Sequence, residues 1–306
     1  MSSPSESYLV GLIGEGVLPS LSPPLHEQAA DRLGLRYLYR PVDLAATAAG
    51  QDAGTGRHGT DGAGGTAARL RTLLHTGREL GFNAFNITHP CKQMVLQYLD
   101  EVSDDAARLG AVNTVLIRNG KFVGHNTDFS GFSAALADGL PHAALDRVVQ
   151  LGVGGAGSAV AYALLSAGCS RLTLIDLDYG RARERAEALG AFFPGQAVTA
   201  ADSADLPTVL AEADGLVHAT PVGMHSHPGL PLDPDLLSPP QWVADVVYRP
   251  LETELVRAAR AKGCAVLDGG FMAVGQAVDA FELITGIRPD ADRMRADFSD
   301  LIKRGR

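Results

Sequence analysis

A run of glycines near the middle of the chain has the composition of a phosphate-binding turn. Residues 152–157 fit the pattern GxGxxG, directly after an apolar run and before the helix-forming segment 158–165. Gly152 permits a tight turn, Gly154 lets the backbone approach a pyrophosphate, and Gly157 lets the helix pack closely on the strand. The amino end of the helix attracts the anion. The pattern predicts a dinucleotide site; the alternative is a glycine-rich turn without a ligand.

The end of the next predicted strand indicates which dinucleotide would bind. Residues 171–176 end in Asp176, close to the roughly 20-residue spacing at which a carboxylate binds the adenine ribose. A carboxylate repels a 2′-phosphate, and Leu177 carries no charge that could neutralise one. We therefore expect NAD rather than NADP. Arg181 and Arg183 leave open a contact with a 2′-phosphate, stacking on adenine, or a solvated helix start.

Polar residues in the N-terminal half gather near predicted strand ends and in the loops beyond them. They are Ser20, Ser22, Asn86, Thr88, Lys92, Asn113, Asn126 and Asp128. In open α/β sheets this edge is where ligands bind. Hydroxyls, amides, one ammonium and one carboxylate suit a small polyhydroxylated acid, because each ring hydroxyl needs a donor and an acceptor. Capping and turn chemistry is the alternative for any single serine or asparagine.

Six motifs in order resemble the shikimate and quinate dehydrogenase family over nearly the whole chain. They are Gly11-Leu-Ile-Gly14 with Ser20-Leu-Ser22-Pro23, Asn86-Ile-Thr88-His-Pro90-Cys-Lys92, Gly110-Ala-Val-Asn113-Thr with Asn126-Thr-Asp128, the glycine loop, Ala219-Thr-Pro221-Val-Gly223-Met224, and Met272-Ala-Val-Gly275-Gln276. The resemblance implies reversible oxidation of a ring hydroxyl of shikimate or quinate by a nicotinamide cofactor. It also implies an N-terminal substrate-binding domain and a C-terminal Rossmann-type domain.

The resemblance assigns roles to individual residues. Lys92 and Asp128 are the implied catalytic pair. The implied substrate contacts are Ser20, Ser22, Asn86, Thr88, Asn113, Tyr248 and Gln276. The implied cofactor contacts are Gly152, Gly154, Gly155, Ala156, Gly157, Asp176, Arg181, Thr220, Val222, Met224, Val247, Gly269 and Met272.

The reaction itself gives a reason for the catalytic pair. Loss of hydride from a carbinol requires removal of the hydroxyl proton, and a positioned base contributes on the order of 10² to 10⁴ in rate. A carboxylate favours the charged form of a nearby ammonium group, so Lys92 with Asp128 suits orientation and relay of a proton better than a lysine acting alone. A structural salt bridge is the alternative for this pair.

Several positions depart from the pattern of the family. Asp176-Leu177-Asp178 stands where the biosynthetic, NADP-linked members usually carry an Asn-Arg-Thr segment, which favours NAD and resembles the quinate/shikimate branch that often serves catabolism. His218 and Glu27 each stand where asparagine is frequent.

Ser20 and Ser22, expected at the substrate carboxylate, are compatible with shikimate, quinate and an amino-substituted ring acid. An NADP-linked enzyme, an aminoshikimate-type dehydrogenase, a dehydrogenase for a folate derivative and a non-catalytic NAD/ring-acid sensor stay open as alternatives.

Composition excludes other classes of partner. Lys and Arg number 26 against 35 Asp and Glu, and the formal net charge of −9 argues against nucleic-acid and anionic-membrane partners. The cysteines Cys91, Cys169 and Cys264 lack CxxC spacing, and His225-Ser-His227 lacks a third ligand, so no metal is expected. Without a signal-peptide pattern at the N-terminus, we expect a cytoplasmic protein with reduced thiols, a small-molecule substrate, and a monomeric or homodimeric state.

The elements that must position these residues follow an α/β pattern. Apolar runs at 8–14, 37–42 and 81–88 predict strands, helices are expected at 25–33 and 70–80, and Asn119-Gly120 predicts a hairpin between 112–117 and 121–124. Strand and helix then alternate from residue 148 to 267, which predicts a doubly wound parallel sheet. The stretches 272–286 and 291–303 have helical spacing and are expected to cover the N-terminal half.

We thus expect two α/β domains. The substrate-binding domain comprises residues 1–127 and 272–306, and the NAD-binding domain comprises residues 128–271. Residues 45–68 are rich in Gly, Ala and Thr with almost no large apolar side chain, so they are expected to form a mobile surface insertion, or else a lid that gates the ligand.

Overall fold

The computed structural model describes residues 7–45 and 63–305. The chain divides into two compact units: Met1–Thr127 with Ala277–Arg306, and Asp128–Gln276. The division at 276/277 falls inside the long helix α11 (Gly269–Thr285), so residues 272–276 group with the second unit. We describe each unit separately.

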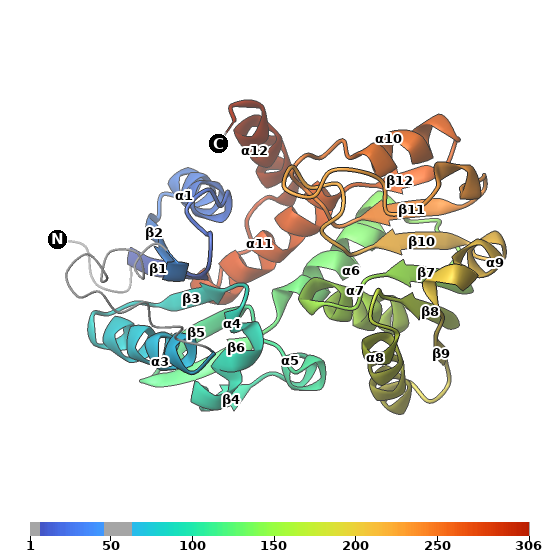
Figure 1. Ribbon diagram of the computed structural model, residues 1–306. Helices are drawn as coiled ribbons and strands as arrows, with labels where there is room; N and C mark the ends of the chain where they lie inside the picture. The colour runs from blue at the N-terminus through green and yellow to red at the C-terminus, as the bar shows by residue number, and fades with distance from the viewer. Residues whose placement is uncertain (1–6, 46–62, 306) are drawn as a thin grey trace, which may run out of the picture. The chain divides into compact units, whose positions relative to one another are not determined.

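The first unit is built on a six-stranded mixed sheet in the order β2-β1-β3-β5-β6-β4 (Figure 1). Its strands are β1 (Ser7–Gly14), β2 (Arg36–Asp43), β3 (Ala84–Ile87), β4 (Glu101–Val102), β5 (Thr114–Arg118) and β6 (Lys121–His125). β1 lies parallel to β2 and β3, whereas β5 is antiparallel to β3 and β6. The predicted hairpin is confirmed, because Asn119 and Gly120 join β5 to β6 with φ angles of 52° and 78°, the left-handed conformation that an Asn-Gly turn requires.

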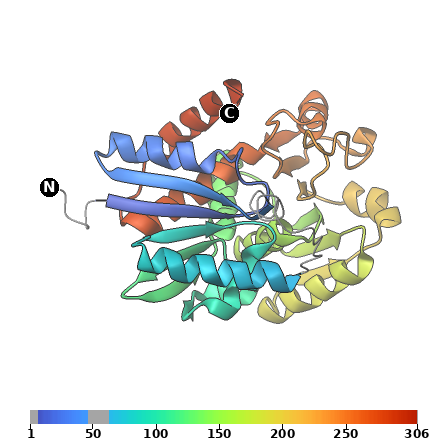
Figure 2. The same ribbon diagram turned by 60° about the vertical axis from the view of Figure 1, so that its left-hand side comes forward.

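Helices cover both faces of this sheet, and Figure 2 shows α1 (Ser22–Arg32) and α3 (Ala63–Glu79) on opposite sides. Leu70 and Leu74 of α3 are buried against the core that includes Phe85 of β3. On the other face, the ring of Phe281 from α11 stacks on Tyr37 of β2 at 5.4 Å. The remaining helices are α4 (Cys91–Met94), the 3₁₀ helix η2 (Val95–Tyr98), α5 (Asp104–Leu109) and α12 (Ala291–Lys303).

The second unit has the predicted doubly wound parallel sheet, in the order β12-β11-β10-β7-β8-β9. Its strands are β7 (Arg147–Leu151), β8 (Arg171–Ile175), β9 (Ala197–Ala200), β10 (Gly215–His218), β11 (Trp242–Asp245) and β12 (Ala265–Leu267). Its helices are α6 (Thr127–Gly139), α7 (Gly155–Ser166), α8 (Tyr179–Phe192), α9 (Leu206–Ala211), α10 (Glu254–Ala261), η3 (Ser203–Asp205), η4 (Pro234–Leu236) and the start of α11. The strand order reverses between β7 and β10, the position at which such sheets bind ligands.

The predicted insertion at 45–68 is wrong at its C-terminal end. Residues 63–68 belong to α3, which begins seven residues before the predicted helix at 70–80. Low apolar content at 63–68 did not prevent a helix, because one buried residue per turn, beginning with Leu70, anchors the later turns and the helix extends back from them. Of the rest of the predicted insertion, residues 46–62 lie outside the described residues.

None of the described helices combines the length and the apolar character that crossing a membrane requires.

Candidate active site

One edge of the first unit's sheet carries several of the predicted substrate residues. β1 and β3 run parallel and pair at Ile13 and Ile87, so the loops that follow both strands leave from the same edge. Ser20 lies in the loop after β1 and Ser22 is the first residue of α1, with the Ser22 N–H donating to Ser20 Oγ at 3.3 Å. The loop after β3 carries Thr88, whose N–H donates to Ile13 O, and it leads into α4 with Lys92. The shared edge follows from the parallel pairing of the two strands.

Lys92 is held by its backbone next to the start of β5. The Val112 N–H donates to Lys92 O at 2.9 Å, and Asn113 O in turn accepts the Ile87 N–H at 2.7 Å. The side chain of Lys92 is half-buried, whereas the neighbouring Cys91 is fully buried. Burial and the charge of Glu15 raise the pKa of the Cys91 thiol to about 11, so this cysteine is a packing residue rather than a nucleophile.

A network of hydrogen bonds between buried polar side chains lies next to this edge of the sheet. Tyr39 Oη donates to Asn86 Oδ1 at 2.5 Å, and Asn86 Nδ2 donates to Thr114 Oγ1 at 2.9 Å. Thr114 Oγ1 donates to Asn113 Oδ1, which also accepts the N–H of Thr127 at 2.8 Å. Asn86 and Asn113 are thus oriented by neighbours on β2, β5 and α6. Tyr39 was missed in the sequence, because its hydroxyl reaches a residue 47 positions away.

Asp128, the predicted carboxylate, lies in the first turn of α6 in the second unit. It is buried, at 8% exposure. Burial raises the pKa of Tyr248, which follows β11; the Arg249 guanidinium lowers this pKa and the Asp128 carboxylate raises it. One turn along α6, a Cβ on Gly131 would lie 2.4 Å from the N atom of Gln276, so α6 and α11 approach closely there. The close approach of α6 to α11 therefore brings Asp128 and Gln276 into one region of the second unit.

The glycine loop has the geometry that its pattern predicts. Gly152 has φ of +91°, and a Cβ there would lie 2.6 Å from Ala219 O. A Cβ on Gly157 would lie 2.3 Å from Gly152 O, whereas nothing lies within 4 Å of one on Gly154 or Gly155. The loop therefore packs tightly at both ends and leaves open space at the amino end of α7, as a pyrophosphate requires. Ala156 lies in the first turn of that helix.

Gln150 of β7 holds the glycine loop and was missed in the sequence analysis. Its fully buried Nε2 donates to Gly152 O at 2.8 Å and to Gly157 O at 2.7 Å, so one amide joins the two ends of the turn. Its Oε1 accepts no hydrogen bond within the described part of the chain. A polar residue inside an otherwise apolar strand was the only signal available in the sequence.

Asp176 follows β8 and faces the glycine loop. Its Oδ2 accepts the Val153 N–H at 3.0 Å, and its Oδ1 accepts the Asp178 N–H at 3.0 Å and Arg181 Nη2 at 2.5 Å. Burial raises the pKa of this carboxyl, but the two backbone N–H groups and the guanidinium outweigh burial, and the net pKa is lowered. Leu177 beside it is fully exposed. Asp176 is therefore an ionised acceptor at the carboxyl edge of the sheet.

The other predicted cofactor residues lie along the neighbouring strand ends. Thr220, Val222 and Met224 follow β10, Val247 follows β11, and Gly269 and Met272 begin α11. A Cβ on Gly269 would lie 2.4 Å from Val247 O, so the start of α11 packs directly on the end of the β11 segment. Because β7, β8, β10 and β11 are parallel, all of these residues share one sheet edge with the glycine loop.

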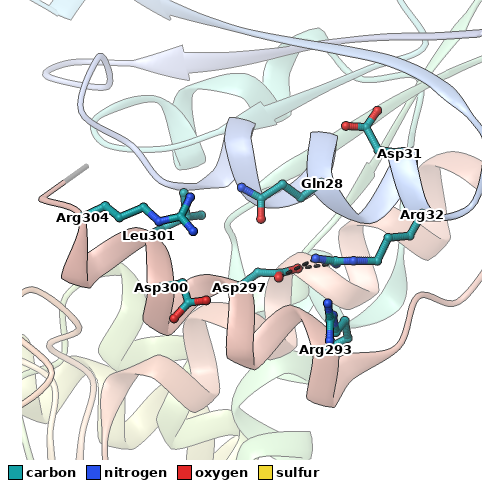
Figure 3. Close-up of a pocket in the computed structure, with 8 residues that line it drawn as sticks. All are labelled: Gln28, Asp31, Arg32, Arg293, Asp297, Asp300, Leu301 and Arg304. Atoms are coloured by element: carbon teal, nitrogen blue, oxygen red, sulfur yellow. Dashed lines mark hydrogen bonds and ion pairs between the residues drawn. The ribbon is translucent and has the colours of Figure 1, made fainter.

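A pocket of about 400 Å³ lies elsewhere in the first unit, between α1 and α12 (Figure 3). Arg32 and Asp297 form a bidentate ion pair in it, with Arg32 Nη2 2.5 Å from Asp297 Oδ1. Its other lining residues are Gln28, Asp31, Arg293, Asp300, Leu301 and Arg304. None of the predicted site residues lines this pocket. Within the described ranges, no group of three or more His, Cys, Asp or Glu side chains could hold a metal ion.

Comparison with known proteins gives the family. Residues 12–115 match the shikimate dehydrogenase substrate-binding domain. The chain is 62% identical over 302 residues to a shikimate dehydrogenase (NADP⁺) of Pseudarthrobacter chlorophenolicus, covering 99% of this chain and 98% of that protein. It is 48% identical to a quinate/shikimate dehydrogenase (NAD⁺) of Corynebacterium glutamicum, covering 97% of this chain and 100% of that protein.

A solved structure agrees with these sequence matches. The quinate dehydrogenase of Corynebacterium glutamicum in complex with NAD superimposes with a TM-score of 0.85 at 47% identity, over 96% of this chain and 99% of that one. Identity and coverage of this extent establish both the two-domain α/β fold and the family. The chain belongs to the shikimate/quinate dehydrogenase family of nicotinamide-dependent oxidoreductases.

Proposed function

We propose that this enzyme catalyses the reversible oxidation of shikimate to 3-dehydroshikimate, of quinate to 3-dehydroquinate, or of both, with NAD as its preferred cofactor. The observation that carries the reaction is the presence of both members of the family's catalytic pair. Lys92 lies half-buried in α4 after β3, and Asp128 lies buried in the first turn of α6. A sensor without turnover would not need to keep both groups.

Lys92 and Asp128 handle the proton of the reacting hydroxyl. The ammonium group and the carboxylate together orient the hydroxyl, and its proton passes to this pair as the carbonyl forms. A bound nicotinamide supplies the acceptor for the hydride that leaves the same carbon. The direction reverses when the pair returns the proton to the carbonyl oxygen.

The substrate residues divide by the group that they would meet. Ser20 and Ser22 donate their hydroxyl hydrogens to the ring carboxylate, and their positions just before α1 and at its first residue accommodate either acid. Asn86, Thr88 and Asn113 bind ring hydroxyls, and Tyr248 and Gln276 are the further substrate contacts that the family implies. Asn86 and Asn113 reach this role already oriented by their buried partners, which lowers the entropic cost of binding.

The preference for NAD rests on Asp176. Its buried carboxylate is ionised and lies at the edge where the adenine ribose is bound in such sheets, so it accepts from ribose hydroxyls and repels a 2′-phosphate. Arg181 is the group that supports the second candidate, an NADP-linked enzyme. Its guanidinium already pairs with Asp176, and turning it toward a 2′-phosphate would break that ion pair. The named relatives include both NADP⁺ and NAD⁺ enzymes.

Initial rates for the four pairings of shikimate or quinate with NAD or NADP test this proposal. We expect formation of reduced cofactor with NAD and at least one acid, and a lower kcat/KM with NADP. Activity with NADP alone would contradict the role given to Asp176. If no pairing reacts while NAD binds, the enzyme acts on another substrate, such as an amino-substituted ring acid, or serves as a sensor.

A further inference from the structure

The second unit contains a buried chain of hydrogen bonds that ends in the loop after β10. His218, the last residue of β10, is completely buried. Its Nδ1 lies 2.9 Å from Asp245 Oδ1 on β11, and its Nε2 lies 2.5 Å from Thr220 Oγ1. Asp245 Oδ2 accepts the hydroxyl of Thr253 at 2.6 Å, and the Val247 N–H donates to Asp245 Oδ1 at 3.0 Å.

The partners determine the direction of every bond in this chain. The carboxylate of Asp245 can only accept, so His218 donates to it from Nδ1–H. In the neutral imidazole the Nε2 atom is then the acceptor, and the hydroxyl of Thr220 donates to it. The Oγ1 atom of Thr220 also accepts the Val222 N–H at 3.3 Å, which leaves its own hydrogen available for the histidine. The imidazole is thereby held by Asp245 in the tautomer that binds Thr220.

Thr220 is in contact with the glycine loop through its other branch. Its Cγ2 lies 2.8 Å from the position that a Cβ on Gly152 would occupy, and Ala219 O lies 2.6 Å from the same position. The Ala219 N–H donates to Leu151 O at 2.7 Å. The segment 219–220 therefore lies directly on the first glycine of the phosphate-binding turn, at the point where the strand order reverses.

We propose that His218, oriented by Asp245, is a positioning residue for the cofactor. It fixes the rotamer of Thr220 and thereby the packing of the loop after β10 on the loop after β7. This inference rests on the cofactor site described under the proposed function. With Oγ1 bound to His218, the Cγ2 of Thr220 is directed at Gly152. Without that bond the side chain can rotate, and the dinucleotide would have to order it on binding.

Four variants of the full chain separate this role from a general contribution to the core. Thr220→Val keeps the shape of the side chain but removes the hydroxyl, and Thr220→Ser keeps the hydroxyl. His218→Asn retains a donor at the place of Nδ1 for Asp245 but has no atom at the place of Nε2. The double variant combines Thr220→Val with His218→Asn. Thr173→Val is the control, because it removes a hydroxyl that lies 3.5 Å from Thr199 on the β8–β9 side of the same sheet.

The measurement is the Kd of NAD by calorimetry, with NADP as the probe if NAD does not bind, together with KM for the ring acid and for the cofactor. We expect Thr220→Val and His218→Asn each to weaken cofactor binding roughly five- to thirtyfold, with the KM of the ring acid changed by less than about twofold. Thr173→Val should bind the cofactor within about twofold of the wild type. Thr220→Ser keeps the bond to His218 but loses the Cγ2 that lies on Gly152, and it should therefore bind the cofactor more weakly than the wild type. The double variant should bind the cofactor no more weakly than the single variant with the higher Kd, since both changes remove the same bond.

Two outcomes would overturn the inference. The first is a Thr220→Val protein that binds the cofactor as the wild type does, a result that decides the matter even if His218→Asn fails to fold. The second is a loss from His218→Asn that persists in full on top of Thr220→Val, because the histidine would then act on the core and not through Thr220. A wild-type protein that binds neither cofactor would contradict the proposed function instead, so the two failures are distinguishable.

Discussion

Tyr39 donates its hydroxyl hydrogen to the side-chain oxygen of Asn86 at 2.5 Å, from a fully buried position on β2. Because Oδ1 is identified as the acceptor by this bond, the amide nitrogen must face Thr114, to which it donates at 2.9 Å. The orientation of Asn86 is therefore decided by the core, before any ligand binds. This relationship links the packing of the first unit to its proposed recognition of a ring acid.

Replacing Tyr39 by Phe should raise the KM for the ring acid about five- to twentyfold, because Asn86 loses the partner that orients it. The KM for the cofactor should stay within about twofold. Steady-state kinetics with each substrate varied in turn checks this. Tyr37→Phe is the matched control, since it removes a hydroxyl bonded to His26 Nδ1 at 3.0 Å on the same strand. Equal changes in both KM values, or in both variants, would show that Tyr39 supports only the fold.

Removing either member of the catalytic pair should abolish turnover but not cofactor binding. For Lys92→Ala and Asp128→Asn we expect kcat to fall by roughly 10² to 10⁴, the contribution of a positioned acid or base. Titration with NAD should give a Kd within about threefold of the wild type. Lys121→Ala removes an exposed lysine paired with Glu101 and should leave kcat unchanged. An unchanged kcat in Lys92→Ala would remove that residue from the mechanism.

The discrimination between cofactors should depend on Asp176 and Arg181 in opposite ways. Asp176→Ala removes the acceptor for the ribose and the repulsion of a 2′-phosphate. The kcat/KM with NAD should therefore fall about tenfold or more, and the ratio of kcat/KM with NAD to kcat/KM with NADP should decrease. Arg181→Ala should reduce any activity with NADP more than activity with NAD. Asp178→Asn, which retains the cap on the Arg181 N–H, serves as the control. A wider preference for NAD in Asp176→Ala would refute the assignment.

Acid should destabilise the first unit through His26. Burial lowers the pKa of this histidine to about 3 from 6.5, so the folded state holds it neutral where the unfolded chain binds a proton. Stability that is complete above pH 6.5 is therefore lost as the pH falls toward 3, with a slope of up to about 1.4 kcal/mol per pH unit from this group.

Comparison of wild type with His26→Gln isolates that contribution. The variant is expected to be less stable at pH 7.5, because it loses the ring contacts with Tyr39 and Phe281. The difference in unfolding temperature between the two proteins should shrink between pH 7 and pH 5, since only the wild type carries the histidine. A difference that stays constant over this range would mean that His26 is protonated equally in both states.

The local features of this protein could be predicted from the sequence, because each depends on a few neighbouring residues. The Asn119-Gly120 turn needs two adjacent residues that tolerate positive φ, and both have it. The glycine loop needs Gly152 and Gly157 between a strand and a helix, and a Cβ at either would collide with backbone. The alternation of strand and helix from β7 to β12 follows from the hydrophobic pattern and leads to the parallel sheet.

Only the tertiary structure decided which distant side chains meet. The strand order of the first sheet is what brings Tyr39 to Asn86, and the pairing of β10 with β11 is what places His218 against Asp245. It also decided that residues 63–68 are helical, although their own composition favours a loop. The reason is the same for both of these side-chain contacts. Hydrophobic periodicity is a property of one segment, whereas a buried polar contact depends on the register between segments that no local pattern encodes.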